Sequence, residues 1–319
     1  MRINGEKMNK GLVILFDDYC KQWERILLEE KPATIGFHWW PPNEPLEKYL
    51  KKTDGREFRQ TVERLENAGI TVEHELHTAS WLLPREDFEK YPEFFRFSDG
   101  KRTPDFNFCA SSKPAQERIS ERAYLLAKRL NQTGNKYHLW CDDSEKITCK
   151  CENCRNLSGS DQAMIFTNAV ARGLRAYSGS SECAYLAYAD AVEIPNVKPE
   201  GNVFLEFAPI HRAHNLPLSA DNENNRRYSE LLDKLLGVFQ GPKVEILDYY
   251  LDVSMQYAWK RDEARDVKYN RDVVIADERF YRRKNINTLK SFAAFVDERY
   301  FDRYTDEPFR DFLKKKETD

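Results

Sequence analysis

The sequence predicts one α/β domain, a (β/α)8 barrel of the TIM type, and three observations support this fold class. Short apolar runs typical of strands alternate with longer helical patterns along the whole chain. The 319 residues are enough for one such barrel, which typically takes about 250 residues. Neither G-x-G-x-x-G nor G-x-x-x-x-G-K-[ST], the common nucleotide-binding signatures of open parallel sheets, occurs. We therefore expect a single barrel domain over residues 1–319.

The amino-terminal half is expected to supply four strands and three helices. The strands are expected at 11–19, 33–40, 70–77 and 136–143, the second of them ending at Pro41 and Pro42. The helices are expected at 21–30, 56–69 and 120–130. In the second helix, Phe58, Val62 and Leu65 recur on one face, which indicates a side packed on the core.

The carboxyl-terminal half continues the alternation. Helices are expected at 161–177 and 228–239. Strands are expected at 182–190, 202–209 and 243–250. The segment 286–295 is expected to hold the last strand and the start of a final helix.

Composition excludes several kinds of partner. The net charge of −3 gives no electrostatic reason to expect nucleic acid or an anionic membrane. The apolar run at 12–16 is far shorter than the roughly 20 residues that span a bilayer. The first eleven residues are polar and lack the apolar stretch of a signal peptide, which predicts a cytoplasmic protein, or a secreted or periplasmic one if the chain is a piece of a longer protein. Nothing in the composition indicates an oligomeric state.

Polar and aromatic side chains gather where the predicted strands end, which is where barrels of this class carry their chemistry. The residues expected to bind substrate are His38, Trp40, His77, Trp140, Tyr188, Glu206, Asp248 and Tyr249. Sugar rings stack their C–H faces on aromatic rings, and their hydroxyl groups bond carboxylates and imidazoles. The pattern therefore predicts an oligosaccharide or glycan as the partner. The expected stacking platforms are Trp39, Trp40, Trp81, Trp140, Tyr249 and Tyr250.

Two neighbouring acids, Asp142 and Asp143, follow the apolar part of the fourth predicted strand. Neighbouring residues of a regular strand point to opposite faces, but a bend at the strand end would let both reach one ligand. That arrangement suits a retaining, substrate-assisted cleavage, in which the 2-acetamido oxygen of the sugar attacks the anomeric carbon. One acid would orient the acetamide and the next would protonate the leaving oxygen. The alternative is an ordinary Asp-Asp turn or helix cap.

Three cysteines follow the acids in a C-x-C-x-x-C pattern, Cys149, Cys151 and Cys154. With Cys141 as a fourth thiolate they would suffice for tetrahedral zinc, which would pin the loop after the fourth strand in a structural role. The alternatives are free thiols without metal, and a disulfide in an exported relative. Catalysis itself is expected to need no cofactor.

The acid-tipped strand that runs into CKCENC (149–154) resembles the signature of glycoside hydrolase family 163, formerly a bacterial domain of unknown function. The run YADAVEIPNVKPEGNVFLEFAPIHRAHNLPL (188–218) is also similar to that family, and the resemblance covers residues 35–300. It implies a (β/α)8 catalytic domain with endo-β-N-acetylglucosaminidase activity in the chitobiose core of N-glycans. Carried over to this chain, it implies Asp143 as acid/base and Asp142 as the residue that orients the acetamide.

Two other functions remain open from the sequence. The first is a metal-dependent hydrolase, which needs two or three rim histidines to converge with Asp190 or Asp248. The candidate histidines are His38, His74, His77, His211 and His214. The second is a barrel that binds carbohydrate without cleaving it.

Overall fold

The structure is a computed structural model that describes residues 8–40, 44–239 and 243–314. Pro41 and Pro42, the expected end of the second strand, lie outside the described residues.

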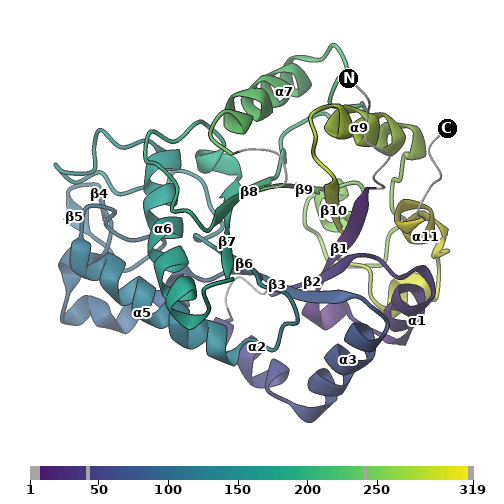
Figure 1. The fold of residues 1–319 in the computed structure, drawn as a ribbon, viewed down its shortest axis with the longest axis horizontal. Helices are drawn as coiled ribbons and strands as arrows, with labels where there is room; N and C mark the ends of the chain where they lie inside the picture. Colours follow the sequence, from purple (N-terminus) through teal and green to yellow (C-terminus); the bar gives the residue numbers. More distant parts are fainter. Residues whose placement is uncertain (1–7, 41–43, 240–242, 315–319) are drawn as a thin grey trace. The chain divides into compact units, whose positions relative to one another are not determined.

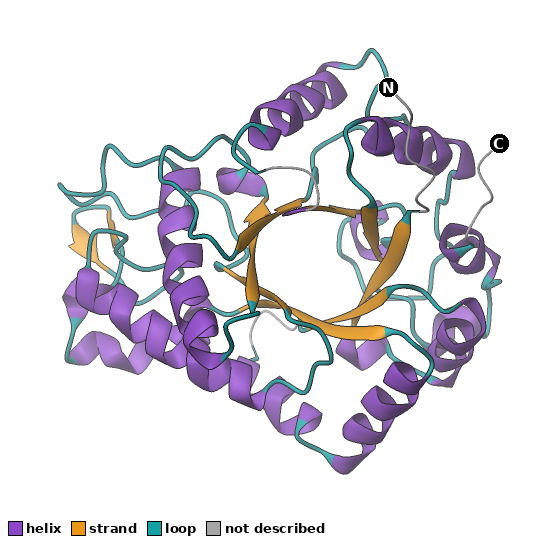
Figure 2. Cartoon of the chain, in the orientation of Figure 1, coloured by secondary structure: helices purple, strands orange, loops and turns teal. Residues whose placement is uncertain are grey.

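Eight parallel strands form a closed barrel in the order β1-β10-β9-β8-β7-β6-β3-β2, as predicted. Figure 2 shows these strands in orange. Their bounds are β1 (Asn9–Leu15), β2 (Thr34–His38), β3 (Thr71–His77), β6 (Lys136–Trp140), β7 (Glu182–Ala187), β8 (Val203–Phe207), β9 (Val244–Asp248) and β10 (Thr288–Phe292). Two short strands, β4 (Phe97–Ser98) and β5 (Lys101–Arg102), pair antiparallel outside the barrel.

Helices alternate with these strands. The α-helices are α1 (Lys21–Glu30), α2 (Leu46–Thr53), α3 (Arg56–Asn67), α4 (Ala79–Leu82), α5 (Lys113–Arg129), α6 (Gly159–Tyr177), α7 (Glu223–Leu236), α8 (Val253–Gln256), α9 (Arg271–Arg283), α10 (Glu298–Phe301) and α11 (Glu307–Leu313). The 3-10 turns are η1 (Phe16–Asp18), η2 (Arg85–Glu89), η3 (Pro92–Phe94) and η4 (Ala189–Ala191). The expected bounds of α1 are confirmed. The first strand was expected to reach residue 19 but ends at Leu15, because η1 begins at Phe16.

The chain divides into two compact units. One unit comprises the described parts of Met1–Trp40, Val62–Glu73 and Glu206–Asp319, and the other comprises those of Pro41–Thr61 and His74–Leu205.

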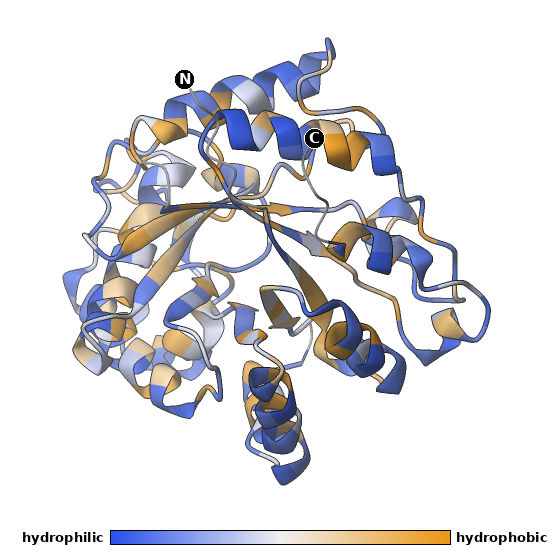
Figure 3. Ribbon diagram, turned by 45° about the vertical axis from the view of Figure 1, so that its right-hand side comes forward, coloured by the Kyte–Doolittle hydropathy of each residue, from blue (hydrophilic) through white to orange (hydrophobic). Residues whose placement is uncertain are grey.

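The first unit is held by aromatic packing between α1 and the carboxyl-terminal segment. Trp23 of α1 is fully buried, and its Nε1 donates a hydrogen bond of 2.7 Å to the Val296 carbonyl oxygen. The Trp23 ring also meets Phe309 of α11 edge-on at 5.0 Å. In Figure 3 the strands are largely hydrophobic, while the helices carry hydrophilic and hydrophobic residues side by side. This distribution is what amphipathic helices on an apolar sheet produce.

The second unit is built around the pair α5 and α6, which lie side by side (Figure 1). Their close approach depends on Gly173, because a Cβ atom there would lie 2.0 Å from the Ser120 carbonyl oxygen. Helix α6 begins with a capping box, in which Ser158 and Asp161 each accept a hydrogen bond from the other's backbone N–H. The start of α6, just after the cysteine-rich loop, is therefore fixed by local sequence.

Candidate active site

The acid pair lies in the loop after β6 and not in the strand itself. The expected strand reached residue 143, but β6 ends at Trp140. The Asp142 backbone N–H donates to Asn107 Oδ1 at 3.0 Å, and the Ser144 N–H donates back to the Asp142 carbonyl oxygen at 3.1 Å. The chain bends at Asp143, so the strand rule that sends neighbouring side chains to opposite faces does not apply to the pair.

Each carboxylate of the pair has its own partner. Asp142 Oδ2 forms an ion pair of 2.6 Å with Arg85 Nη2, and both side chains are half-buried. Asp143 is exposed, and its Oδ1 accepts a hydrogen bond of 3.1 Å from the Tyr188 hydroxyl group. The ion pair was not expected for Asp142, whose predicted role involved substrate alone. A carboxylate removed from water requires a compensating charge, and Arg85 supplies it.

A recess beside the pair gathers several of the predicted residues of the second unit. Those of its lining residues that the sequence also singled out are His77, Trp140, Cys141, Asp142, Tyr188 and Asp190. The His77 ring meets Trp140 edge-on at 5.2 Å, and its Nδ1 is bonded to the Cys141 carbonyl oxygen. Asp143 is not among the lining residues. The shared contact of both acids with one sugar therefore stays a prediction.

Most of the expected stacking platforms are buried, which corrects the prediction of exposed rings. Trp140 is 3% exposed, and Trp39, Tyr249 and Tyr250 are also buried. Tyr249 is stacked on Phe292 with a centroid distance of 5.7 Å, so that face is occupied by protein. The large rings near strand ends fill the interior, as bulky apolar side chains commonly do.

The two remaining platforms, Trp40 and Trp81, are half-buried. One face of Trp81 is covered by the Arg122 guanidinium, 4.2 Å from the ring centroid, and its Nε1 donates to Glu47 Oε2 at 3.1 Å. Trp40 meets Phe295 edge-on at 5.3 Å.

Besides Tyr249, three residues of the first unit that were expected to bind substrate are buried instead. His38 is 5% exposed and packs edge-on against Phe292 at 5.4 Å. Glu206 is fully buried, 3.0 Å from Lys290 Nζ. A polar residue within a strand looks the same in the sequence whether it faces a ligand or an interior partner, and here the interior partner is present.

The third of these residues, Asp248, is fully buried in an ion-pair network. Its Oδ1 lies 3.5 Å from Arg212 Nε and accepts a 2.8 Å hydrogen bond from the Tyr249 N–H. Burial is the largest influence and favours the neutral acid, but the Arg212 charge, His214 and the Tyr249 N–H together lower the pKa of Asp248. Asp248 is thus an interior anion that fixes Arg212.

The rim histidines do not form the metal site that the second function requires. His214 Nδ1 lies 3.5 Å from Asp248 Oδ1. His74 is buried and bonded through Nδ1 to the Tyr49 hydroxyl group. Within the described part of the chain, none of the five candidate histidines belongs to a group of three or more clustered ligand atoms.

Three of the four cysteines predicted as zinc ligands cluster in the structure, and the fourth, Cys141, does not. Cys149, Cys151 and Cys154 cluster with Cys109, and all four sulfur atoms lie within 4.8 Å of one another. Cys141 is not in this group but lines the recess beside Asp142. Cys109 belongs to the segment before α5, 40 residues upstream of Cys149. At that distance the sequence shows no recognisable metal-ligand spacing.

Arg85 and Asn107 are the other site residues that the sequence did not indicate. Both come from the long connection between β3 and α5, which has no recognisable motif. A general signal did exist for Arg85, since a half-buried carboxylate predicts a cationic partner without saying which one.

A comparison with protein families shows which family the chain belongs to. The model of the family described as a domain of unknown function (DUF4838) matches residues 40–302. The chain belongs to this family. No curated protein sequence matches the DUF4838 chain.

Solved structures show what the DUF4838 fold is similar to. A β-N-acetylhexosaminidase from Bacteroides fragilis NCTC 9343 aligns over 97% of this chain with a TM-score of 0.57 and 14% identity. The chain spans 66% of that enzyme's length. PbGH5A, a glycoside hydrolase family 5 enzyme from Prevotella bryantii B14, aligns over 96% of this chain and 95% of its own, with a TM-score of 0.51 and 9% identity.

A third similar structure is a GH5 family lichenase from Caldicellulosiruptor sp. F32, with a TM-score of 0.52 and 12% identity over 97% of this chain and 93% of the lichenase. At these identities the likeness shows the fold alone, a barrel that this chain shares with a β-N-acetylhexosaminidase and two family 5 enzymes. In the described residues, no helix combines the length and apolar character needed to cross a bilayer.

Proposed function

We propose that this DUF4838 chain is a glycoside hydrolase that cleaves β-linked N-acetylhexosamine-containing glycans with retention of configuration. The observation that carries the proposal is the loop after β6, where Asp142 and Asp143 are consecutive, differently paired and next to a recess. The barrel shared with a hexosaminidase and two family 5 enzymes supports the same class of reaction. The resemblance to glycoside hydrolase family 163 supports the finer assignment, an endo-β-N-acetylglucosaminidase acting within the N-glycan core.

Asp142 is suited to orient the acetamide. Its Oδ2 is held by Arg85, which fixes the plane of the carboxylate. Within the described part of the chain, Oδ1 has no hydrogen-bond partner and can accept the acetamide N–H. That bond would turn the acetamide oxygen towards the anomeric carbon and would strengthen as positive charge develops on the acetamide.

Asp143 is suited to be the acid and base. It is exposed, and its Oδ2 has no hydrogen-bond partner among the described residues. The Tyr188 hydroxyl group holds Oδ1 and fixes the side chain. In the first step Asp143 gives its proton to the leaving oxygen while the acetamide oxygen bonds to the anomeric carbon. In the second step it takes a proton from water, which opens the cyclic intermediate.

The test uses a fluorescently labelled complex-type N-glycopeptide, followed by chromatography of the products. Cleavage in the chitobiose core should leave one N-acetylglucosamine on the peptide. Asp143→Asn should lower kcat at least about 100-fold, the usual range for loss of a general acid, while leaving the fold intact. Glu145→Gln, an exposed carboxylate of the same loop, is the matched control and should keep wild-type activity.

A thiazoline analogue of the cyclised intermediate should inhibit the wild-type chain competitively, because it imitates the proposed oxazoline. Equal turnover by wild type and Asp143→Asn would refute the assignment of the acid. Tight binding of the glycopeptide by the wild-type chain without product would indicate the non-catalytic alternative.

A further inference from the structure

We propose that Cys109, Cys149, Cys151 and Cys154 together bind one zinc ion in a structural site. All four side chains are free thiols, three of them are buried, and their sulfur atoms lie within 4.8 Å of one another. This set differs from the one that the sequence suggested, because Cys109 takes the place of Cys141.

The spacing of the sulfur atoms fits a tetrahedron around zinc. Zinc–sulfur bonds of about 2.3 Å place neighbouring sulfur atoms about 3.8 Å apart at the corners of a tetrahedron. Cys109 Sγ lies 3.7 Å from Cys151 Sγ and 3.9 Å from Cys154 Sγ. The chain folds these thiols to the separation that one ion requires.

The surroundings of the cluster suit thiolates. The Phe97 N–H points at Cys149 Sγ and the Ser111 N–H points at Cys154 Sγ, each at 3.3 Å. Such N–H donors stabilise negative sulfur and orient it towards a metal. The cationic Arg102 side chain interacts with Cys109. Four thiolates and Zn²⁺ carry a net charge of −2, which these donors and Arg102 partly offset.

The site is closed and therefore structural. Four protein thiolates fill the tetrahedral positions and leave none for water or substrate. The ligands come from two segments of the chain, since Cys151 follows Cys109 at a sequence separation of 42. One ion would thus join the segment before α5 to the loop after β6.

This junction bears on the acid pair. Asn107, two residues before Cys109, accepts the Asp142 backbone N–H. On the far side, Gln162 of α6 bonds both the N–H and the carbonyl oxygen of Cys149, at 2.8 and 3.0 Å. The zinc ion would connect these two supports and so position Asp142 without touching substrate. This consequence for catalysis rests on the proposed glycosidase function, whereas the metal site does not.

The test of the site itself is metal content, measured by mass spectrometry on the full chain purified without chelator. We expect about one zinc per chain. Folded protein grown with zinc that contains none after purification would overturn the proposal. Cobalt loaded in place of zinc should give the visible and charge-transfer bands of a tetrahedral tetrathiolate centre, and a spectrum of octahedral cobalt would contradict the site.

The matched pair of variants is Cys109→Ser and Cys141→Ser. Cys109→Ser should lower zinc affinity at least about tenfold, while Cys141→Ser should keep about one zinc per chain. The reverse result would restore the set suggested by the sequence and refute this one. If Cys109→Ser does not fold, the cobalt spectrum of the wild-type chain decides.

Removal of zinc separates the two proposals. On the labelled glycopeptide, the metal-free chain should show kcat reduced about 10- to 100-fold with a smaller change in KM, and zinc should restore it. A chain that binds one zinc but never cleaves the glycopeptide would refute the proposed function and leave the metal site standing. Full activity in a chain shown to be metal-free would refute the positioning role.

Discussion

At the scale of single residues, the Arg85–Asp142 ion pair determines how the acid loop can work. Arg85 lies in η2, far from the acids in sequence, and holds one oxygen of Asp142 at 2.6 Å. Because the pair is half-buried, water screens it less than it would a surface pair. Its contribution is to fix an orientation, which matters more for a reacting group than for stability.

Arg85→Gln should therefore lower kcat on the glycopeptide by up to about 100-fold, the cost of a misplacement near 1 Å, with little effect on unfolding. Arg85→Lys should recover part of the loss, because it restores the charge but not the planar guanidinium. The control is Arg118→Gln, which removes a separate ion pair with Asp87 in the same unit. Steady-state kinetics of the three variants test whether Arg85 positions Asp142. Unchanged activity in Arg85→Gln would contradict that role.

Two buried aspartates make the stability of the chain depend on pH. Burial raises the pKa of Asp18 to about 6, although the Arg261 charge opposes it. Burial likewise raises the pKa of Asp252 to about 6, against a hydrogen bond from Ser254. The folded chain holds these protons more tightly than the unfolded chain, whose carboxyl groups titrate near 3.8. Their contribution to stability is therefore full below about pH 4 and is lost as pH rises through 6.

Asp252→Asn should flatten this dependence while keeping the acceptor that caps α8. Between pH 7 and pH 5, the free energy of unfolding of the wild type should rise more than that of the variant, by about 1 kcal/mol. Urea denaturation at several pH values measures the difference. Asp302→Asn, an exposed position, should leave the profile unchanged, and equal slopes for wild type and Asp252→Asn would contradict the assignment.

The structure brings some of the predicted site residues together, while their roles stay predictions. The sequence indicated Asp142, Asp143, Tyr188 and the three clustered cysteines of the loop after β6, and in the structure Tyr188 contacts Asp143 while Arg85 pairs with Asp142. The sequence did not indicate Arg85, Asn107 or Cys109, because the residues around them do not show which loop they contact in the folded chain. Asp248 and Glu206 were predicted to bind a ligand, because the sequence does not show whether an acid in a strand has a partner in the protein interior.

At the scale of elements, the α5–α6 contact depends on the absence of a side chain. Gly173→Ala would improve helix propensity by about 1 kcal/mol in isolation, but its Cβ would meet the Ser120 carbonyl oxygen. The backbone of the neighbouring helix cannot move away without a loss of packing energy, so we expect a net loss of about 1–3 kcal/mol in the free energy of unfolding.

Gly179→Ala is the matched control, since nothing lies within 4 Å of the added Cβ. Its free energy of unfolding should stay within about 0.5 kcal/mol of wild type. Thermal and urea unfolding of both variants compare the two positions. A Gly173→Ala chain as stable as the control would show that the helices separate without cost.

The elements themselves were predicted where periodicity is strong and missed where it is weak. α1 and the buried face of α3 follow from apolar spacing, and Phe58, Val62 and Leu65 are buried as expected. α2 and α9 were not predicted. The first is short, and α9 (RDVVIADERFYRR) contains seven charged side chains, which obscure a narrow apolar face.

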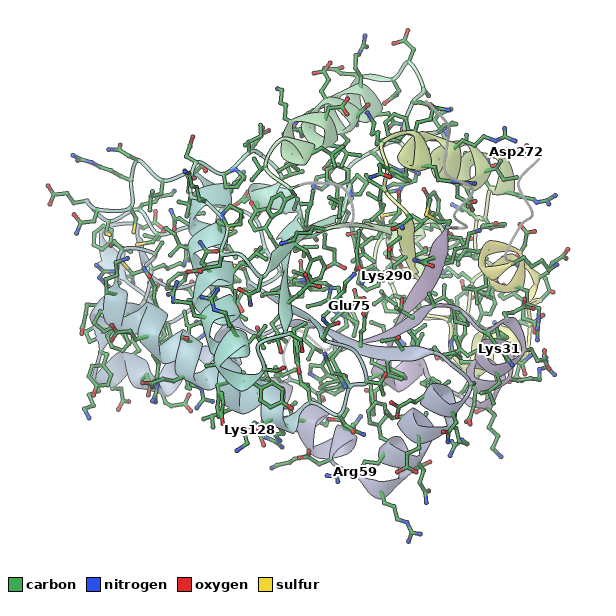
Figure 4. All side chains as sticks on the ribbon, in the orientation of Figure 1. Lys31, Arg59, Glu75, Lys128, Asp272 and Lys290 are labelled. Atoms are coloured by element: carbon green, nitrogen blue, oxygen red, sulfur yellow. The ribbon has the colours of Figure 1, made fainter. Side chains whose placement is uncertain are left out.

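At the scale of the whole molecule, closure of the barrel brings charged strand residues into its interior. Lys290 of β10 is fully buried and extends inward from its strand (Figure 4). Its Nζ lies 3.0 Å from Glu206 of β8, 3.4 Å from Glu245 of β9 and 3.6 Å from Glu73 of β3. By contrast, Lys128 of α5 points into solvent.

Lys290→Met should destabilise the chain by about 3–5 kcal/mol, because it leaves buried carboxylates without their counter-charge. Adding Glu206→Gln should recover part of the loss by removing one of those charges. Lys128→Met should change the free energy of unfolding by less than about 1 kcal/mol. Chemical denaturation of the series measures the effect, and a Lys290→Met chain as stable as Lys128→Met would exclude the network as a stabilising feature.

The alternation of strand and helix was enough to predict the barrel, because eight repeats leave few other closed arrangements. It could not predict the connection from β3 to α5, which carries Arg85, Asn107, Cys109 and the β4–β5 hairpin. That connection has little periodicity of its own and is ordered by long-range contacts, such as the Lys150 N–H bond to the Phe97 carbonyl oxygen.

The attachment of Cys149 to Gln162 limits where the acid loop can adapt. Two backbone bonds make Cys149 move with α6, and Trp140 is held at the end of β6 by bonds from Thr78 to its carbonyl oxygen. Within the acid loop, adjustment around an incoming glycan would then fall on residues 141–148. The acids reside in this short span, so substrate selectivity would be altered most directly by changing its length, while both anchors stay as they are.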